Sequence, residues 1–387
     1  MSGISRIPWK TWSIACALLL AAVASVSAQI GFEGPRFHRL GGHPHAVVTG
    51  DFDGDGARDV CVASRREGSV FLFRNRGGGE LDRPIRYTSG SGTTDLVVVD
   101  LDGESGGEIV AVNSGSDTIR VVIPGRRRPL RPIRVGRHPM AIVAGDFDED
   151  GTNDVVTANY WSRDLSLLLG EGTGSFRKER RIATNRHPSA LAAGDLDQDG
   201  HLDLVVANEA ENDLTILLGR GNGTFSPPRH DPAGVGPRAP VVVEGAGTPR
   251  IAVVLFAEHL LAILPDPLPE HSGAPSLEEA PSNVALSPPQ LSFRKTVSVG
   301  KGPVSLAAGD LDGDGKPDLV TANRISGRLD LLLGTGKGTF EPVRSIPLDD
   351  PGDVALGDLD GDGRDDIVVA MENAQKIASF LSHANPL

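Results

Sequence analysis

Short glycine-containing segments of this sequence carry four acidic residues at a fixed spacing. In the first segment Gly56 stands at position 6, and the acids at positions 1, 3, 5 and 9 are Asp51, Asp53, Asp55 and Asp59. Alternate carboxylates across a tight turn bring their oxygens toward one point, and glycine permits the sharp reversal of the chain. The carbonyl of Ala57 at position 7 can add a further oxygen. A hard cation that takes about six to eight oxygen ligands is calcium, so the segment predicts a calcium-binding loop.

Four further segments repeat this spacing. Their acids are Asp146, Asp148, Asp150 and Asp154, then Asp195, Asp197, Asp199 and Asp203, then Asp310, Asp312, Asp314 and Asp318, and finally Asp358, Asp360, Asp362 and Asp366. A sixth segment is weaker, because Ser105 replaces the glycine and the acids are Asp100, Asp102, Glu104 and Glu108. A single Asp-Gly turn is usually solvated and free of metal, but repeated copies of one oxygen set favour a metal. We expect about five or six bound calcium ions.

An EF-hand shares the first half of this spacing but needs an acid at position 12 and flanking helices. Position 12 is Val62 in the first loop and Thr157 in the second complete loop, and both lie in apolar runs. The sequence therefore argues against an EF-hand.

The loops belong to a longer internal repeat. The segment HPHAVVTGDFDGDGARDVCVAS at 43–64 returns at 138–159, 187–208, 302–323 and 351–372, and a weakened copy occupies 94–113. A degenerate copy at 240–254 has lost the acidic loop, with Glu244 in the place of the first acid. We predict seven repeats, at about 43–90, 91–136, 137–185, 186–235, 236–300, 301–348 and 349–387 plus 30–42. The Pro/Ser/Glu-rich stretch 265–292 is interpreted as a flexible insertion.

Each repeat carries about four short apolar runs, which predicts four β-strands. In the third repeat they span 141–145, 154–159, 165–169 and about 176–182. Four-stranded units of this length, repeated seven times, predict an all-β, seven-bladed β-propeller. The last repeat stops after its third strand at 376–380, whereas 36–40 resembles a fourth strand. We expect this N-terminal strand to pair with the last blade and close the ring.

The chain resembles the FG-GAP/VCBS-type repeats of the integrin α-subunit propeller and of many exported bacterial proteins. The residues that carry the resemblance are the acidic loops, the LVVAN-type strand after them, and LLLGTGKGTF at 331–340. The resemblance covers nearly all of the chain after residue 28. It implies that the four acids of each loop are calcium ligands, and it leaves the second and fifth repeats in doubt because they depart from the pattern.

The N-terminal residues predict export. Arg6 and Lys10 precede an apolar run at 14–26, and small residues lead up to Ala28. This order describes a signal peptide at 1–28, so we expect a periplasmic or extracellular protein without a stable membrane anchor. Cys61 is then the one remaining cysteine, and its apolar neighbours predict a buried thiol.

The acidity follows from the loops. Removing Arg6 and Lys10 takes the formal net charge from −13 to −15, and six calcium ions would return it to about −3. The charge therefore predicts metal binding, and we expect no nucleic-acid partner. We also expect a monomer.

The loops opposite the calcium sites carry a different set of residues. We single out as ligand-face candidates His43, Arg137, His138, Tyr160, Trp161, Arg163, Arg186 and His187. Cations attract anionic glycans or acidic proteins, and adjacent aromatic rings stack on sugars or anchor a protein. The alternative is that His-Pro is a framework turn and that the arginines are solvated surface residues.

Three classes of function remain open. The first is a binding or scaffold module for an extracellular protein or glycan. The second is a carbohydrate-active enzyme of the lyase or dehydratase type, for which the pointers are the irregular fifth repeat with Glu258 and His259 and the inserted segment 265–292. The third is a purely structural surface or matrix protein. The sequence has no nucleophile elbow and no phosphate-binding glycine loop, so we expect a protein that is not an enzyme.

Overall fold

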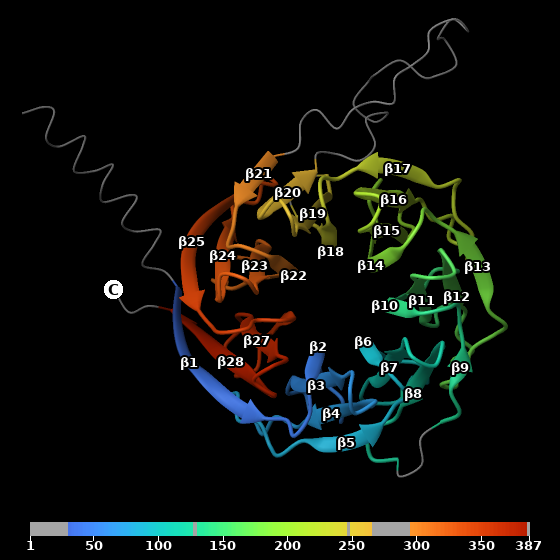
Figure 1. Ribbon diagram of the computed structural model, residues 1–387. Helices are drawn as coiled ribbons and strands as arrows, with labels where there is room; N and C mark the ends of the chain where they lie inside the picture. Colours follow the sequence, from blue (N-terminus) through green and yellow to red (C-terminus); the bar gives the residue numbers. More distant parts are fainter. Residues whose placement is uncertain (1–29, 127–129, 246–247, 265–294, 385–387) are drawn as a thin grey trace, which may run out of the picture.

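Short runs of valine, leucine, isoleucine and alanine form the strands of seven antiparallel sheets. The computed structural model describes residues 30–126, 130–245, 248–264 and 295–384. In this part of the chain seven four-stranded sheets stand around a central axis as the blades of a propeller (Figure 1). The predicted all-β, seven-bladed propeller is confirmed. The predicted signal peptide and the insertion at 265–292 lie outside the described residues.

The blades are numbered in chain order from β2. The innermost strands are β2 (Pro44–Gly50), β6 (Thr93–Val99), β10 (Pro139–Gly145), β14 (Pro188–Gly194), β18 (Pro237–Val243), β22 (Pro303–Gly309) and β26 (Val354–Gly357). The second strands are β3 (Asp59–Ser64), β7 (Glu108–Asn113), β11 (Asp154–Asn159), β15 (Asp203–Asn208), β19 (Arg250–Leu255), β23 (Asp318–Asn323) and β27 (Asp366–Met371).

The third and fourth strands lie farther from the axis. The third strands are β4 (Ser69–Phe73), β8 (Thr118–Val122), β12 (Asp164–Leu168), β16 (Asp213–Leu217), β20 (Leu260–Leu264), β24 (Arg328–Gly334) and β28 (Lys376–Ala384). The outermost strands are β5 (Ile85–Thr88), β9 (Ile133–Arg134), β13 (Arg180–Ala183), β17 (Arg229–Pro232), β21 (Lys295–Ser298), β25 (Phe340–Pro347) and β1 (Ile30–Arg39). Among the described residues no helix is long and apolar enough to cross a membrane.

Burial changes with distance from the axis. All residues of the second strands β11 and β15 are buried, whereas the outermost strand β13 is mostly exposed. The second strands are buried because both faces pack against neighbouring blades, which explains their continuous apolar sequences. Seven hydrophobic clusters each join two adjacent blades, and one of them packs Val47 and Val62 of blade one against Val368 and Ile377 of blade seven.

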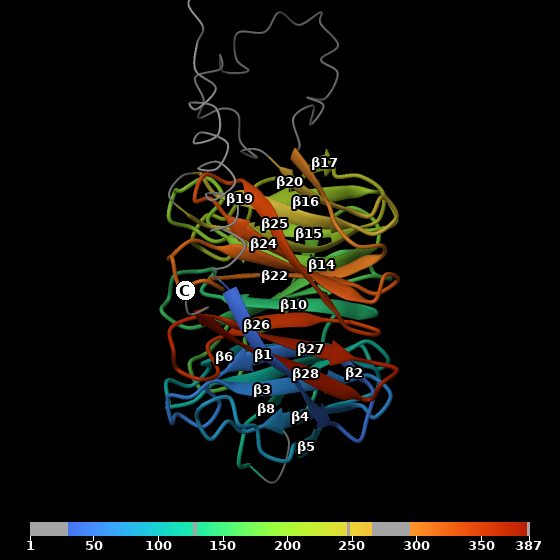
Figure 2. The same ribbon diagram turned by 90° about the vertical axis from the view of Figure 1, so that its left-hand side faces the viewer.

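The two ends of the described chain meet in blade seven. β1 pairs antiparallel with β28, from Ile30 opposite Ala384 to Arg39 opposite Lys376. Figure 2 shows β1 beside β28 at the edge of the ring. The outermost strand of the last blade therefore comes from the N-terminal side of the described chain.

The third repeat shows one difference from its predicted strands. β13 begins at Arg180, whereas we expected the fourth strand from residue 176. Phe176 does pair with Gly170, but as an isolated bridge, and Leu167 pairs with Arg180. Arg180 lies four residues after Phe176, whereas Gly170 lies three residues after Leu167. The fourth strand therefore has one extra residue, and this β-bulge interrupts the ladder. The predicted start was wrong because apolar patterning does not mark such a bulge.

Two carboxylates that the sequence reasoning missed connect the innermost strands. Asp353, just before β26, accepts hydrogen bonds from the Val47 N–H of blade one at 2.9 Å and from the Ser305 hydroxyl of blade six at 2.6 Å. Asp95 in β6 accepts one from the Ile142 N–H of blade three at 2.9 Å. The signal was present in the sequence, because these acids replace a small residue that is alanine in several other repeats.

These carboxylates are desolvated as well as hydrogen-bonded. Burial, together with the charge of Asp353, raises the pKa of Asp95 to about 7. Burial also raises the pKa of Asp353, and the hydroxyl and amide donors oppose that rise. Asp353 thus joins blades six, seven and one at the place where the ring closes.

We predict that Asp353→Ala lowers the free energy of unfolding by about 1–3 kcal/mol, because it leaves a buried N–H and a buried hydroxyl without an acceptor. Asp353→Asn keeps one carbonyl acceptor, so its free energy of unfolding should lie between those of Asp353→Ala and the wild type. Urea unfolding at pH 7 measures the difference, with the exposed Asp349→Ala as control. Equal stability of Asp353→Ala and Asp349→Ala would show that this junction contributes nothing.

Candidate calcium centres and the opposite face

The last acid of each complete loop is the first residue of a second strand and is fully or almost fully buried. One oxygen accepts a hydrogen bond from the N–H of loop position 2, as in Asp154 to Phe147 at 2.9 Å. The other accepts one from an N–H near the end of the third strand, as in Asp154 from Gly170 at 2.7 Å. The same pair of bonds holds Asp59, Asp203, Asp318 and Asp366.

The first acid of each loop organises the turn itself. Asp310 accepts hydrogen bonds from the N–H groups of Gly313 at 2.8 Å, Asp314 at 3.1 Å and Gly315 at 2.8 Å. The glycine at position 6 has a positive φ in all five complete loops, for example 88° at Gly56. An added Cβ there would meet no atom within 4 Å, so the glycine is required for its backbone conformation rather than for space.

Carboxylate oxygens gather inside the loops. Ligand atoms lie within 4.8 Å of one another in the groups Asp51–Asp53–Asp55, Asp100–Asp102–Glu108, Asp146–Asp148–Asp154, Asp195–Asp197–Asp199 and Asp310–Asp312–Asp318. Two buried oxygens at position 3, Asp53 Oδ1 and Asp148 Oδ1, accept no hydrogen bond. Buried anionic oxygens without donors cost free energy unless a cation binds them, so the residues fit calcium.

The charges inside the loops are poorly tolerated without a cation. Burial raises the pKa of Asp154 to about 6 and that of Asp318 to about 7. Backbone hydrogen bonds oppose this rise in pKa, and the charges of neighbouring carboxylates add to it. Burial likewise raises the pKa of Asp59, Asp203 and Asp366 to about 6. Four loops have a basic counter-charge beside an acid. Arg177 lies 3.2 Å from Asp148 Oδ2 and 2.8 Å from Asp150 Oδ2, Arg74 lies 3.4 Å from Asp53 Oδ2, Lys316 pairs with Asp314, and Arg364 lies 4.0 Å from Asp362 Oδ2.

The loop of the second repeat keeps part of this arrangement. Glu108 accepts a hydrogen bond from the Leu101 N–H at 2.8 Å, and Asp100 accepts one from Gly103 at 2.7 Å. The structure brings Asp100, Asp102 and Glu108 together in one group. The bond that the complete loops form from position 6 to the first acid is absent from the described hydrogen bonds of this loop.

The fifth repeat has no acidic loop in its described residues. Glu244 follows β18 as Asp195 follows β14, in agreement with the expected alignment. Val243 pairs with Arg250, whereas in blade four Gly194 pairs with Asp203. Arg250 therefore stands in the place of the buried acid, and the sequence reasoning did not single it out.

The loops also join neighbouring blades. The Asp365 N–H donates to the Asp310 carbonyl at 2.7 Å, and the Gly107 N–H donates to the Asp51 carbonyl at 2.9 Å. A glycine in the hairpin after the third strand donates to position 2 of the preceding loop, as in Gly223 to Phe147 at 2.8 Å. An ion that orders one loop therefore acts on two blades.

Four of the ligand-face candidates meet between blades three and four. The His138 and Trp161 rings are stacked, with centroids 4.2 Å apart and planes at 12°, and Trp161 is 56% exposed. The Tyr160 ring lies between the two histidines, with its centroid 6.2 Å from that of His138 and 4.7 Å from that of His187. The connections that carry these residues enter a first strand or follow a second strand, so they lie on the face opposite the acidic loops.

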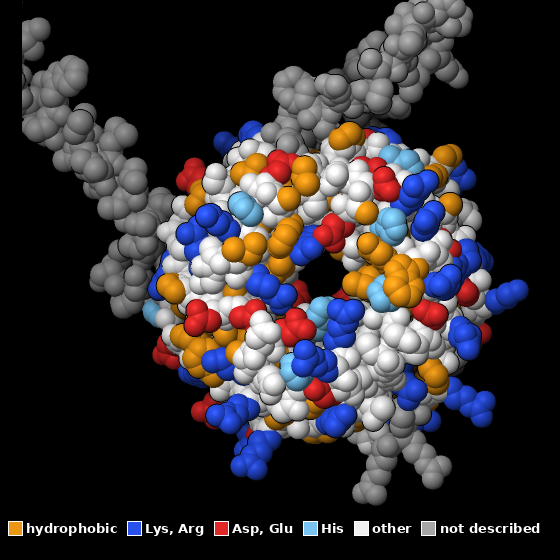
Figure 3. All heavy atoms as spheres, in the orientation of Figure 1, with side chains coloured by type: hydrophobic (Ala, Val, Ile, Leu, Met, Phe, Trp, Pro, Cys, Tyr) orange, Lys and Arg blue, Asp and Glu red, His pale blue; other side chains and the backbone are white. Residues whose placement is uncertain are grey.

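The remaining candidates lie outside this cluster. Arg137, Arg163 and Arg186 are exposed, and the Arg137 carbonyl accepts hydrogen bonds from the Trp161 N–H at 3.1 Å and the Ser162 N–H at 3.4 Å. His43 belongs to another group, because its Nδ1 lies 3.0 Å from Glu67 Oε1 in blade one. Figure 3 shows one face of the ring with a central opening bordered by histidines and by basic, acidic and hydrophobic side chains, and a hydrophobic patch beside a histidine over blades three and four.

Comparison with known proteins identifies the repeat. The sequence profile of the FG-GAP-like repeat matches residues 51–111, 146–206, 195–244 and 310–369. No curated protein sequence shows significant similarity to the chain.

Several solved structures share the fold at low sequence identity. A virginiamycin B lyase from Staphylococcus aureus is 14% identical, with a TM-score of 0.59 over 91% of this chain and 99% of the lyase chain. BBS1N, from its complex with ARL6DN, is 12% identical, with a TM-score of 0.61 over 89% and 93%. A hydrazine synthase of Kuenenia stuttgartiensis is 14% identical, with a TM-score of 0.60 over 89% and 96%. At these identities the similarity concerns the fold alone.

We predict that residues 29–387 bind about five or six calcium ions and that chelation lowers Tm by about 10 °C or more, because each ion binds the folded state alone. Calorimetric titration of metal-depleted protein gives the count. The double variant Asp146→Ala/Asp148→Ala should lose one ion, whereas the exposed Asp349→Ala should lose none. Asp102→Ala tests whether the loop of the second repeat contributes an ion. A chelated protein with unchanged Tm would mean that the loops are metal-free turns.

The raised pKa values of the buried acids predict how calcium-free protein responds to pH. An acid whose pKa is higher in the folded state stabilises the fold fully below its unfolded pKa, and this stability is lost as the pH rises through the folded pKa. Metal-free protein should therefore have a higher Tm at pH 5 than at pH 7.5. With saturating calcium, the Tm at pH 5 should no longer exceed the Tm at pH 7.5. Asp318→Asn should reduce the dependence of the metal-free Tm on pH. A metal-free Tm that rises from pH 5 to pH 7.5 would contradict the prediction.

Proposed function

The chain belongs to the FG-GAP-like repeat family, and on this basis we propose that it is an exported, calcium-binding β-propeller that serves as a binding or scaffold module. Its partner would be a protein or glycan at the cell surface or outside the cell. The proposal of export is supported by the basic and apolar residues at the N-terminus. The proposal of calcium is supported by the unsatisfied carboxylate oxygens of the loops.

The observation that carries the binding function is the cluster of His138, Tyr160, Trp161 and His187. An indole that is 56% exposed and stacked on an imidazole is preorganised to receive a sugar ring or an apolar side chain. His138 and His187 have φ values of 55° and 57°, a region that non-glycine residues seldom occupy. The surrounding contacts hold this backbone, as in the hydrogen bond from the His138 N–H to Asp117 at 2.8 Å.

Cations flank the cluster on the same face. Arg137 and Arg186 are exposed and precede the two histidines in the chain, and the described residues include no ion pair for either. Positive charge beside stacked rings favours a partner that combines anionic and planar or ring-shaped groups, such as an acidic glycan or an acidic protein segment. The resident acids of the calcium loops lie on the other face and do not neutralise these arginines.

The alternative of an enzyme rested on Glu258 and His259 in the irregular fifth repeat. Glu258 accepts a hydrogen bond from the Val235 N–H at 2.6 Å, and His259 Nδ1 lies 3.0 Å from the Phe256 carbonyl oxygen. The Gly302 N–H lies 3.2 Å from the same nitrogen, which accepts from this N–H when it carries no proton and donates to the Phe256 carbonyl when it does. These contacts support the role of both residues in holding the turn, and they favour the binding module over the lyase or dehydratase reading.

We predict that Trp161→Ala weakens binding to the best partner found in a glycan array or surface-protein screen by about tenfold or more, because an exposed aromatic anchor that the partner would cover is lost. Arg137→Gln should weaken binding less, and its effect should vanish at high salt. Phe37→Ala is the matched control, because Phe37 is a 50% exposed aromatic residue on the outermost strand β1. Equal affinity of Trp161→Ala and Phe37→Ala would refute this face as the binding surface.

A further inference from the structure

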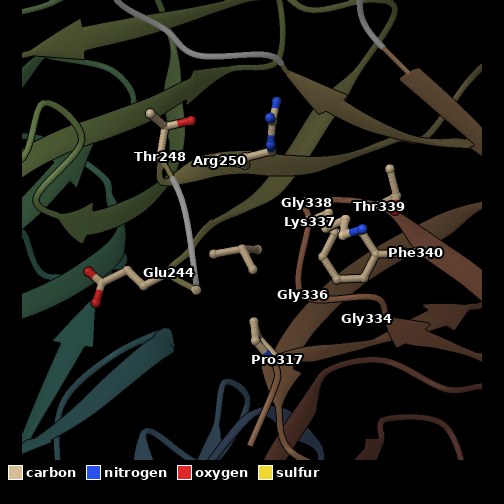
Figure 4. A pocket seen from close by; sticks show the side chains of 12 residues that line it. Glu244, Thr248, Arg250, Pro317, Gly334, Gly336, Lys337, Gly338, Thr339 and Phe340 are labelled. Atoms are coloured by element: carbon tan, nitrogen blue, oxygen red, sulfur yellow. The ribbon is translucent and has the colours of Figure 1, made fainter.

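A pocket between blades five and six occupies the place where other blades carry an acidic loop. Its volume is about 290 Å³, and its described walls come from residues 243–245, 248 and 250 of blade five and from Pro317 and the hairpin between β24 and β25 of blade six. Figure 4 shows Arg250 and Thr248 on the side of blade five, and Phe340 and the hairpin glycines on the side of blade six. The pocket exists because blade five has lost the loop that fills the equivalent space elsewhere.

The loss of the loop is accompanied by a reversal of charge. At the first position of the second strand the other six blades carry an acid, namely Asp59, Glu108, Asp154, Asp203, Asp318 and Asp366. Blade five carries Arg250 there, half-buried, and Lys337 stands opposite on the hairpin. No carboxylate among the described residues forms an ion pair or hydrogen bond with either cation. Glu244 also lines the pocket, but its side chain points away from the hairpin in Figure 4.

The hairpin of blade six offers a backbone donor as well. In blades one, three and four the equivalent glycine donates its N–H to a carbonyl of the preceding loop: Gly79 to Leu359, Gly174 to Leu101 and Gly223 to Phe147. Gly338 is their counterpart, and no backbone acceptor faces it among the described residues. Gly336 and Gly338 have φ values of 74° and 65°, a left-handed backbone that recurs in anion-binding turns.

We propose that this pocket binds a small organic carboxylate. The anion faces the Arg250 guanidinium, the Lys337 ammonium and the Gly338 N–H, which are complementary to a carboxylate in charge and hydrogen bonding. The apolar body of the ligand packs against Val243, Pro317 and Phe340. The pocket lies on the face of the acidic loops, so this binding is independent of the partner proposed for the cluster around Trp161.

Three probes test the site on calcium-loaded protein: benzoate, galacturonate and sulfate, followed by saturation-transfer NMR and calorimetric titration. We expect benzoate to bind and Arg250→Met to weaken it by about tenfold or more, since a charge-assisted hydrogen bond and an ion pair are lost. Arg250→Lys should retain part of the affinity, and Lys337→Met should cause a smaller loss.

Arg220→Met is the matched control. Arg220 is an exposed residue of the equivalent hairpin in blade four, where the Gly223 N–H is already bonded to the Phe147 carbonyl. Unchanged calcium stoichiometry and Tm in Arg250→Met would show that the variant is folded. Benzoate binding that survives Arg250→Met, sulfate binding as tight as benzoate binding, or no binding of benzoate and galacturonate at millimolar concentration would each overturn the proposal.

Discussion

The rest of the molecule depends on the buried carboxylate at the start of the second strand of six blades. In each complete loop this group accepts one hydrogen bond from an N–H of the turn before it and one from an N–H near the end of the third strand. Three segments of a blade are thereby joined at one side chain. The arrangement is costly, because burial and neighbouring acids oppose ionisation, as the raised pKa of Asp318 shows. A bound cation would offset that cost, which connects the fold of the blade to metal chemistry.

The ring extends this local constraint to the whole molecule. Five of the six acidic loops, those of blades one, two, three, six and seven, contact the next blade through backbone hydrogen bonds in the described residues. Each interface between blades also contains its own hydrophobic cluster. At the closing interface the pairing of β1 with β28 and the two hydrogen bonds of Asp353 add to that packing. Contacts between blades are thus repeated around the circle, and a change in one loop is felt by two blades. This coupling explains why we expect calcium to act on the stability of the entire propeller rather than on single turns.

The sequence was sufficient for the fold because two independent signals agreed. The spacing of acids located the turn between the first two strands, and the continuous apolar run after it marked a strand buried on both faces. Features that depend on a neighbouring blade were harder to predict. Asp95 and Asp353 act through amides of other blades, and the stacking of Trp161 on His138 joins two connections of one blade at the edge of the next. The bulge before β13 escaped prediction because it changes pairing without changing hydrophobicity.

Departures from the repeat are then the most informative positions on the chain. A blade that lost its acidic loop without other changes would place a buried acid at the start of β19 with no ion to offset its charge. The chain instead carries Arg250 at that position, next to a hairpin whose glycine amide finds no backbone acceptor among the described residues. An arginine that forms no ion pair with a carboxylate of the described residues is costly to hold half-buried, unless an anion from outside completes the site. The same reasoning that assigns cations to the complete loops therefore assigns an anion to the one blade where the sign of the charge is reversed.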